Sequence, residues 1–370
     1  MVEAVREDTP PVEVGQPQRR DLRQGIEERG ALLPVEAGPG PRTDEIRTLQ
    51  LQPRADGRSV LWVGMQGGGV ARLADGAWTR WHIGNSALPS DFVSDLELVL
   101  PPGGEPEVWA GTRSGLAILR GDGSWTAPDP RVALLRERVR TLTRGRNSQG
   151  VPVLWIGADG GVVRTPLQGP WHLVSTLGKN GNGIWGLRVE RGADGGARVW
   201  LGSDGDGLAR FEQGRWQVFS TADGLPSNTI RSIARIADGS PEGTLWVGTW
   251  GGHLARLQGG SFQELPTPWP KPDNEAVSIL LAERDDIWTS TRQNGIAHWN
   301  GREWRWWAPD ASMPGRIYTA IRHGRDVWFS TADKGLARFR DGEWRFFRGD
   351  IGLPDDALYD MRLIENAGNP

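Results

Sequence analysis

The sequence contains no cysteine, which excludes disulfide bonds and cysteine-ligated metal centres. Lysine is scarce, with only Lys179, Lys271 and Lys334 among 43 basic residues. No run of about 18 or more apolar residues occurs, so no membrane-spanning helix is expected. The first residues are charged and lack an apolar segment, and therefore do not form a signal peptide as they stand. The net charge of −3 gives no electrostatic reason to expect contact with nucleic acid or with an anionic membrane surface.

Residues that favour turns, and residues with indole rings, are abundant instead. The 370 residues include 52 glycines, 26 prolines and 20 tryptophans, against 2 tyrosines and 8 phenylalanines. This content of glycine and proline is typical of a chain with many turns and lies below the level that indicates disorder. Thirteen of the tryptophans fall on one repeating pattern, which indicates a packed repeat protein.

The repeating unit is centred on an aliphatic residue followed by tryptophan, a pair that recurs seven times at intervals of 40 to 47 residues. We call these residues the anchor tryptophans: Trp62, Trp109, Trp155, Trp200, Trp246, Trp288 and Trp328. Glycine or serine follows two residues after each anchor. A second aromatic residue follows sixteen residues after each anchor, at Trp78, Trp125, Trp171, Trp216, Phe262, Trp304 and Trp344. A spacing of sixteen residues that holds in all seven units is not expected by chance.

Each unit is expected to form four short strands. Around Trp200 the strands are predicted at 184–189, 198–202, 208–211 and 216–220, separated by turns that contain glycine. The residues beside each anchor are mostly apolar, and the small residue two positions later leaves room for a neighbouring sheet, so both faces of each sheet are expected to be buried. Repeats of this length with four strands are typical of a propeller. The sequence therefore predicts an all-β fold, a seven-bladed β-propeller of four-stranded antiparallel blades.

The propeller is expected to occupy residues 41–364, after a linker or disordered tail at 1–40 and before a short tail at 365–370. Eight segments could form the first strand of a unit, but only seven anchors follow them, so the strand predicted at 358–363 is surplus. This strand could begin a further blade of a longer polypeptide. It could also close the ring at its seam, or belong to an eighth blade completed by the N-terminal segment.

Two stretches carry a family resemblance: GLPSNTIRSI at 224–233 with LWVGT at 245–249, and GLARF at 335–339 with DGEW at 341–344. They resemble the two-component regulator propeller repeat, which all seven units match in part. In that family the repeats form the periplasmic or extracellular input region of bacterial sensors, and the output domains lie further along the polypeptide. The resemblance therefore implies a non-catalytic sensor domain that is part of a longer periplasmic or extracellular protein. A chain complete as given would be expected in the cytoplasm.

Two rings of variable residues can be read from the register of the repeat. One ring lies four residues after each anchor, and the other lies one position after the first aliphatic residue of each first strand. Residue types vary at these positions while their neighbours keep theirs, as expected of a scaffold that carries a site. The ligand-binding candidates are Arg47, Arg113, Arg140, Trp185, Arg231, Trp250, Arg292 and Tyr318. They would suit an anion or a sugar through charged hydrogen bonds and stacking. Alternatively, the arginines line a solvated channel and support the blades.

Other motifs have simpler interpretations. The glycines at 64–69 recur as turns in every unit and precede no predicted helix, so we do not assign them to a dinucleotide. Asp204 and Asp206 have the spacing of a calcium loop, but its other ligands are missing, which favours a turn. The arginine-rich stretch at 131–146 lacks interleaved aromatic residues and is interpreted as a solvated loop.

His253 and His298 lie in adjacent units and are interpreted as packed or surface residues. A metal bound by either histidine together with a carboxylate would instead favour a lyase or hydrolase. We therefore expect no catalytic residue, no metal and no cofactor. The favoured function is a sensor domain that binds a small ligand or a protein partner on its loop face. A free-standing interaction scaffold and a metal-dependent lyase or hydrolase remain as alternatives.

Overall fold

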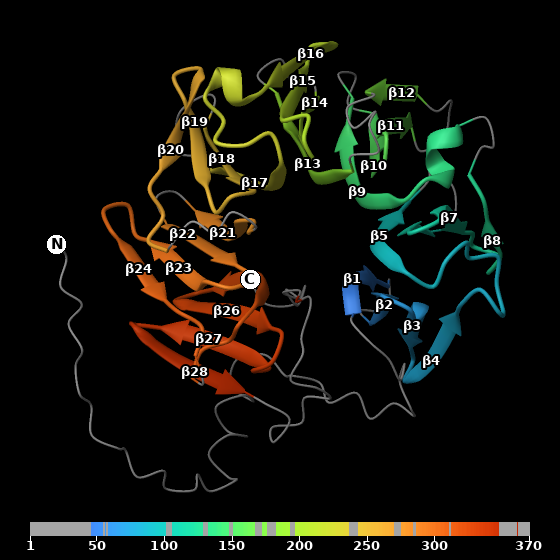
Figure 1. Cartoon of the computed structure of the whole chain (residues 1–370). Helices are drawn as coiled ribbons and strands as arrows, with labels where there is room; N and C mark the ends of the chain where they lie inside the picture. Colours follow the sequence, from blue (N-terminus) through green and yellow to red (C-terminus); the bar gives the residue numbers. More distant parts are fainter. Residues whose placement is uncertain are drawn as a thin grey trace, which may run out of the picture. The chain divides into compact units, whose positions relative to one another are not determined.

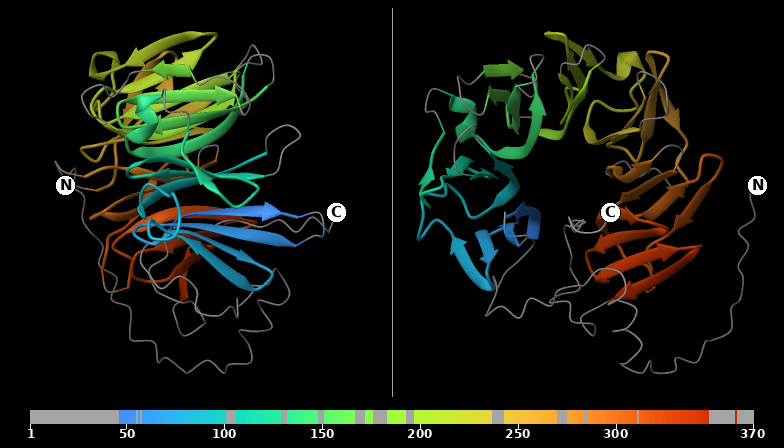
Figure 2. Two further views of the ribbon diagram at one scale, coloured as in Figure 1. Left: turned by 90° about the vertical axis from the view of Figure 1, so that its right-hand side faces the viewer. Right: turned by 180° about the vertical axis from the view of Figure 1, so that it is seen from behind.

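The computed structural model describes residues 46–54, 56, 58–100, 106–128, 132–147, 151–166, 172–175, 183–192, 197–236, 243–269, 275–283, 286–310, 312–347 and 361. The tails predicted at 1–40 and 365–370 lie outside these residues, as does the surplus strand at 358–363 apart from Met361. The described strands form seven four-stranded antiparallel sheets, each in simple chain order. They are arranged as a ring around a central axis (Figure 1), which Figure 2 also shows from behind. The predicted seven-bladed propeller is confirmed.

We number the sheets as blades 1 to 7 along the chain and name their strands a to d in chain order. The a strands lie innermost in the ring (Figure 1). They are β1 (Ile46–Pro53), β5 (Val93–Val99), β9 (Val139–Arg146), β13 (Ile184–Arg191), β17 (Ile230–Ile236), β21 (Ser278–Glu283) and β25 (Ile317–His323). The b strands, which carry the anchors, are β2 (Ser59–Met65), β6 (Glu107–Thr112), β10 (Pro152–Ala158), β14 (Ala197–Ser203), β18 (Thr244–Thr249), β22 (Asp286–Thr291) and β26 (Asp326–Thr331).

The c and d strands complete each blade toward its outer edge. The c strands are β3 (Gly69–Ala74), β7 (Gly115–Leu119), β11 (Gly161–Pro166), β15 (Leu208–Glu212), β19 (Leu254–Gln258), β23 (Gly295–Trp299) and β27 (Leu336–Arg340). The d strands are β4 (Ala77–Trp81), β8 (Trp125–Thr126), β12 (His172–Ser175), β16 (Arg215–Phe219), β20 (Ser261–Leu265), β24 (Trp304–Trp307) and β28 (Glu343–Phe347). The four strands predicted around Trp200 correspond to β13 to β16, within two residues at each end.

Two short 3₁₀ helices connect blades, η1 (Ala133–Arg136) and η2 (Thr221–Asp223). The arginine-rich stretch at 131–146 was predicted to be one solvated loop, and this prediction is wrong. The first half of the stretch contains η1. Its second half is the strand β9, which pairs along its length with β10. Val139 and Leu142 of β9 are buried, so this segment is held in the sheet by apolar contacts while its arginines project between them.

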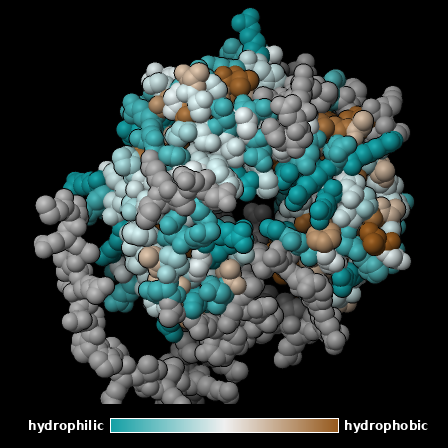
Figure 3. Space-filling model, viewed as in Figure 1, coloured by the Kyte–Doolittle hydropathy of each residue, from teal (hydrophilic) through white to brown (hydrophobic). Residues whose placement is uncertain are grey.

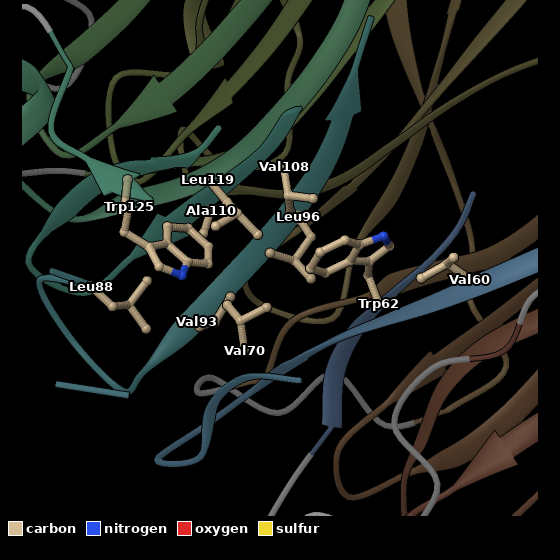
Figure 4. Packing of buried hydrophobic residues seen from close by; sticks show 11 residues of the cluster. Val60, Trp62, Val70, Leu88, Val93, Leu96, Val108, Ala110, Leu119 and Trp125 are labelled. Atoms are coloured by element: carbon tan, nitrogen blue, oxygen red, sulfur yellow. The ribbon is translucent and has the colours of Figure 1, made fainter. Parts of the chain in front are cut away.

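The core is divided among the interfaces between blades. Six anchors are buried, from Trp155 with 0% exposure to Trp62 with 5% exposure, and only Trp328 is half-buried. Figure 4 shows one interface, where Trp62 and Val70 of blade 1 face Val93 and Leu96 of blade 2. Because each sheet lies between two others, its b strand is buried on both faces, and all six residues of β6 are buried.

The small residue after each anchor makes the close approach of blades possible. A Cβ atom on Gly202 would lie 2.6 Å from Ile230 Cγ2 of the next a strand, and one on Gly111 would lie 2.7 Å from Val139 Cγ1. Real side chains do not approach this closely, so these positions exclude even alanine without movement of the neighbouring blade. This observation confirms the reason that we inferred for the small residue.

A cation covers most of the anchors from the paired c strand, a feature that the sequence pattern did not reveal to us. The guanidinium carbons of Arg72, Arg164, Arg210 and Arg338 lie 5.6 to 5.8 Å from the ring centroids of Trp62, Trp155, Trp200 and Trp328. Each pair is directly opposite in the antiparallel ladder. In blade 6 the same place is taken by His298, whose ring stacks on Trp288 at 4.1 Å. The four arginine pairs stabilise their anchors through cation–π contact, and His298 packs on Trp288 by ring stacking.

Candidate functional site

The predicted ring residues of the a strands owe their position to a repeated irregularity in the sheet. In six of the seven described blades, the register between strands a and b shifts at the second residue of strand a. The residues left out of the ladder are Arg47, Ser94, Arg140, Trp185, Arg231 and Tyr318. Such a bulge frees a side chain from the alternation of the strand. In blade 6 the shift occurs at Leu280 instead, so Ser278 stays paired with Ser290.

The second predicted ring is held beside the first by backbone hydrogen bonds. The N–H groups of Arg113, Asp159, Asp204, Trp250 and Ala332 donate to the carbonyl oxygens of Phe92, Arg138, Gly183, Thr229 and Arg316, at 2.9 to 3.1 Å. In each blade the acceptor immediately precedes strand a. Both rings therefore lie at the end of the propeller where the a strands begin, which we call the entrance end.

Four of the predicted residues form one cluster at the entrance end. Trp185 of blade 4 is approached by Arg140 of blade 3 and by Arg231 of blade 5, whose guanidinium carbons lie 4.1 and 3.8 Å from the centroid of its ring. Arg231 also lies over Trp250 of its own blade, at 5.8 Å. Trp185 keeps 36% exposure, so the indole is held between two cations while part of it faces solvent. We call these four residues the Arg–Trp cluster.

Carboxylates compensate only part of this positive charge. Asp159 accepts hydrogen bonds from Arg140, 2.5 Å from Nε and 3.2 Å from Nη2. Burial lowers the pKa of Arg231 below its ordinary value, and the nearby charges of Arg140 and Arg316 lower it further. The carboxylate of Asp204 acts on this pKa in the opposite direction. Since arginine stays protonated at any physiological pH, the site presents a partly desolvated, permanent positive charge.

The other candidates lie apart from this cluster. Arg47 Nε donates to Gln66 Oε1 at 2.6 Å, and Arg113 lies 5.5 Å from the ring of Phe92. The guanidinium carbon of Arg316 lies 4.7 Å from the centroid of the Tyr318 ring. Arg292 is exposed on the turn between β22 and β23. The structure thus brings Arg140, Trp185, Arg231 and Trp250 together and does not add Arg292 to them. Ligand binding by these residues stays a prediction.

Sequence reasoning missed two arginines that contribute to the same charge. Arg138 and Arg316 immediately precede strands β9 and β25, two residues before the ring positions Arg140 and Tyr318. Their shared place in the repeat was available as a signal. In the structure both residues lie one position before the first residue of strand a, outside the two predicted rings.

The motifs set aside in the sequence have ordinary surroundings in the structure. His253 Nδ1 lies 2.8 Å from Glu264 Oε1, and His298 Nε2 lies 3.1 Å from Asp286 Oδ1. The described residues contain no group of three or more histidine, aspartate or glutamate side chains placed to hold a metal ion. Gly205 and Gly207 take positive φ angles of 106° and 87°, as residues of a tight turn do.

No family model matches the sequence, and no curated protein matches it either. Solved structures do match the fold. The computationally designed protein Ika8 is 14% identical, with 86% of this chain and 90% of that chain covered and a TM-score of 0.55. A streptogramin B lyase is 16% identical, with 78% and 92% covered and a TM-score of 0.51.

The structural matches also include the extracellular domain of the hybrid two component system BT3049 from B. thetaiotaomicron. It is 16% identical, with 83% of this chain covered and a TM-score of 0.36. This chain spans 46% of the length of that domain. Identities this low establish similarity of fold alone. Among the described residues, none of the helices has the length and apolar character needed to cross a bilayer.

Proposed function

We propose that this propeller is a non-catalytic binding domain that captures a small anion at its entrance end. The observation that carries the proposal is the Arg–Trp cluster, in which two guanidinium groups from different blades converge on one half-exposed indole. Guanidinium groups bind carboxylates and phosphates through paired, charge-assisted hydrogen bonds. In the face drawn in Figure 3, many hydrophilic residues lie on either side of the central opening.

An anion fits this cluster better than a neutral sugar does. Neutral sugars are commonly held against the open face of an aromatic ring, but two guanidinium groups already lie within about 4 Å of the Trp185 ring. The groups left to meet a ligand are therefore the N–H donors of Arg140 and Arg231. These donors carry full positive charge and select a negatively charged acceptor.

The chemistry of the cluster supports binding rather than catalysis. Arginine does not release a proton near neutral pH, and tryptophan offers only an indole N–H donor. The nearby Asp159 is hydrogen-bonded to Arg140 and so is engaged in holding that side chain. We therefore assign the cluster to recognition, and propose that the propeller domain itself is non-catalytic.

We further propose that the domain serves as the input region of a bacterial signalling protein, located in the periplasm or outside the cell. The support is the resemblance of the segments at 224–233 and 335–344 to the two-component regulator propeller repeat. In this proposal, anion binding links blades 3, 4 and 5 at the entrance end. Such a link between blades is a structural change that neighbouring domains of the same polypeptide could transmit.

Thermal unfolding tests the binding proposal, because a ligand that binds the folded state raises the midpoint by mass action. The probes are citrate, inorganic phosphate, glucuronate and the neutral sugar maltose, at one ionic strength. We expect at least one anion, and not maltose, to raise the midpoint of the wild-type protein. The double variant Arg140→Met with Arg231→Met is expected to lose this response, whereas Arg302→Met, which removes an exposed arginine of an outer turn, retains it. An equal response in the double variant would contradict the proposal.

A further inference from the structure

A second group of arginines lies beside the Arg–Trp cluster and is not used by it. Arg138 precedes β9, and its pKa is lowered below the ordinary value by burial and by the charges of Arg140, Arg113 and Arg47. Asp159 acts in the opposite direction, but this carboxylate is already hydrogen-bonded to Arg140. The entrance end therefore carries positive charge from blade 1 through blade 3, continuous with that of the Arg–Trp cluster.

Two buried donors where this second group meets the Arg–Trp cluster are incompletely satisfied. Arg138 Nε and Arg140 Nη1 are both buried, and neither has a hydrogen-bond partner among the residues that the structure describes. A buried guanidinium donor without an acceptor costs free energy, and like charges nearby add to that cost. An anion bound at this place would offset both costs at once.

The arginines on the rim of this group are held in place before any ligand arrives. The Arg113 guanidinium lies over the exposed ring of Phe92 at 5.5 Å, and the Arg113 N–H donates to the Phe92 carbonyl oxygen at 2.9 Å. Gln66, which accepts from Arg47, forms an isolated β-bridge with Phe92. The cation–π contact of Arg113 and the hydrogen bond of Arg47 to Gln66 thus hold both side chains at the entrance end, where Arg138 also lies. Side chains that are fixed in advance lose less conformational entropy on binding.

We infer that the ligand carries at least two anionic groups, one held by Arg140 and Arg231 and the other by Arg138 and Arg113. This inference rests on the proposed function and names the class of its ligand, a compact polyanion with several phosphate or carboxylate groups. The charge of Arg140 acts on both Arg138 and Arg231, lowering the pKa of each. A ligand with a single charge can occupy only one subsite.

Titration calorimetry at constant ionic strength tests this inference with inorganic phosphate and tripolyphosphate, and with acetate and citrate as the carboxylate pair. We expect the wild-type protein to bind the multivalent member of at least one pair about tenfold or more tightly than the simple member. Arg138→Met is expected to weaken binding of that multivalent anion about tenfold and to leave the simple anion within about twofold. The exposed Arg113→Met variant, which leaves the buried residues untouched, is expected to act in the same direction. Arg302→Met is the matched control, and thermal unfolding without ligand verifies that each variant is folded.

The two proposals fail in different ways. If the multivalent anions bind no more tightly than the simple ones, or if Arg138→Met and Arg113→Met leave the preference unchanged, the second subsite is wrong while the proposed function stands. If Arg231→Met leaves all anion binding unchanged, the proposed function itself is wrong. Comparison of the phosphate pair with the carboxylate pair shows which chemical class the ligand belongs to. A site that recognises phosphate groups binds tripolyphosphate more tightly than citrate, and a site that recognises carboxylates shows the opposite order.

Discussion

At the level of single residues, the stability of this ring depends on two kinds of position, the large anchors and the small residues that follow them. The anchors fill the interfaces between blades, and the residue two positions later is small because the next a strand passes directly over it. A buried tryptophan removes about 150–250 Å² from water, so correct spacing around it has a large effect on stability. The small residue sets that spacing.

Replacement of one such glycine tests this role. In Gly202→Ala the new methyl group would lie 2.6 Å from Ile230 Cγ2, so blade 5 must shift or Ile230 must leave its rotamer. We expect the free energy of unfolding to fall by about 1–3 kcal/mol, the usual cost of overfilling a packed interface. Urea denaturation measures this change.

Gly315→Ala is the matched control, because nothing lies within 4 Å of a Cβ atom at that position and its φ angle is not positive. We expect this variant to keep the stability of the wild-type protein. Equal stability of the two alanine variants would mean that blades 4 and 5 are not in close contact at Gly202.

The residues of the candidate site were only partly accessible from the sequence, for a physical reason. The spacing of the repeat places Arg140, Trp185 and Arg231 at equivalent positions, but it does not reveal that a bulge releases each of them from the ladder. Nor does the spacing show which blades are close enough for their long side chains to meet. Arg292 occupies the same position after its anchor as Trp250 does, yet it lies on an exposed turn.

At the level of strands and blades, the fold itself was predictable because one local pattern is repeated seven times. Each unit need only form a four-stranded meander, and the apolar residues on both faces of its b strand then require a neighbour on each side. In each described sheet, every strand pairs only with strands that are adjacent to it in the sequence. Pairing between strands that are distant in the sequence, which is difficult to predict in most β proteins, is therefore not needed to form a blade. Blade 6 is the exception in register, because its bulge falls at Leu280 and not at the equivalent of Trp185.

Three ion pairs join the a strands of adjacent blades. Arg144 pairs with Glu97 at 2.6 Å, Arg235 with Glu190 at 3.0 Å, and Arg322 with Glu283 at 2.6 Å. These pairs connect blades 2 and 3, blades 4 and 5, and blades 6 and 7. Glu190 also accepts a hydrogen bond from the indole of Trp200 at 3.0 Å, so this pair orients an anchor as well.

The link between blades 6 and 7 gives a prediction about pH. Burial acts to raise the pKa of Asp286, but the hydrogen bond and charge of His298 and the charge of Arg322 outweigh it, so the pKa lies below its ordinary value. A carboxyl group with a pKa depressed by folding stabilises the protein above the pKa of the unfolded state. This contribution is lost as the pH falls through the folded-state pKa. We therefore expect stability to decrease as the pH falls below about 4.

Urea denaturation of the wild-type protein and of Asp286→Asn between pH 7 and pH 3 measures this contribution. The variant lacks the titrating carboxyl group, so its stability is expected to fall less steeply with acidity than that of the wild type, from a lower value at pH 7. Glu303→Gln, a change at an exposed carboxylate of an outer turn, is expected to follow the wild-type curve. Parallel curves for the wild type and Asp286→Asn would show that this carboxylate contributes nothing to acid sensitivity.

For the whole molecule, the seam between blade 7 and blade 1 differs from the other six interfaces. Each of the other interfaces has an apolar cluster with members from both adjacent blades. The cluster of Val63, Met65 and Ala71 draws its described members from blade 1 alone. Met65 is nevertheless fully buried, with 0% exposure. Among the described residues, no apolar side chain of blade 7 belongs to this cluster.

Truncation tests how the ring is completed at this seam. The sequence predicts a surplus strand at 358–363, and closure of the ring is one of its predicted roles. If that role is correct, deletion of residues 348–370 exposes the face of Val63 and Met65 to water, and the midpoint of thermal unfolding falls by several degrees. Deletion of residues 1–40 serves as the control and is expected to leave the midpoint unchanged. An unchanged midpoint after the C-terminal deletion would instead favour a role for this strand in a further blade, because a strand that belongs to a neighbouring blade contributes nothing to the closure of this ring.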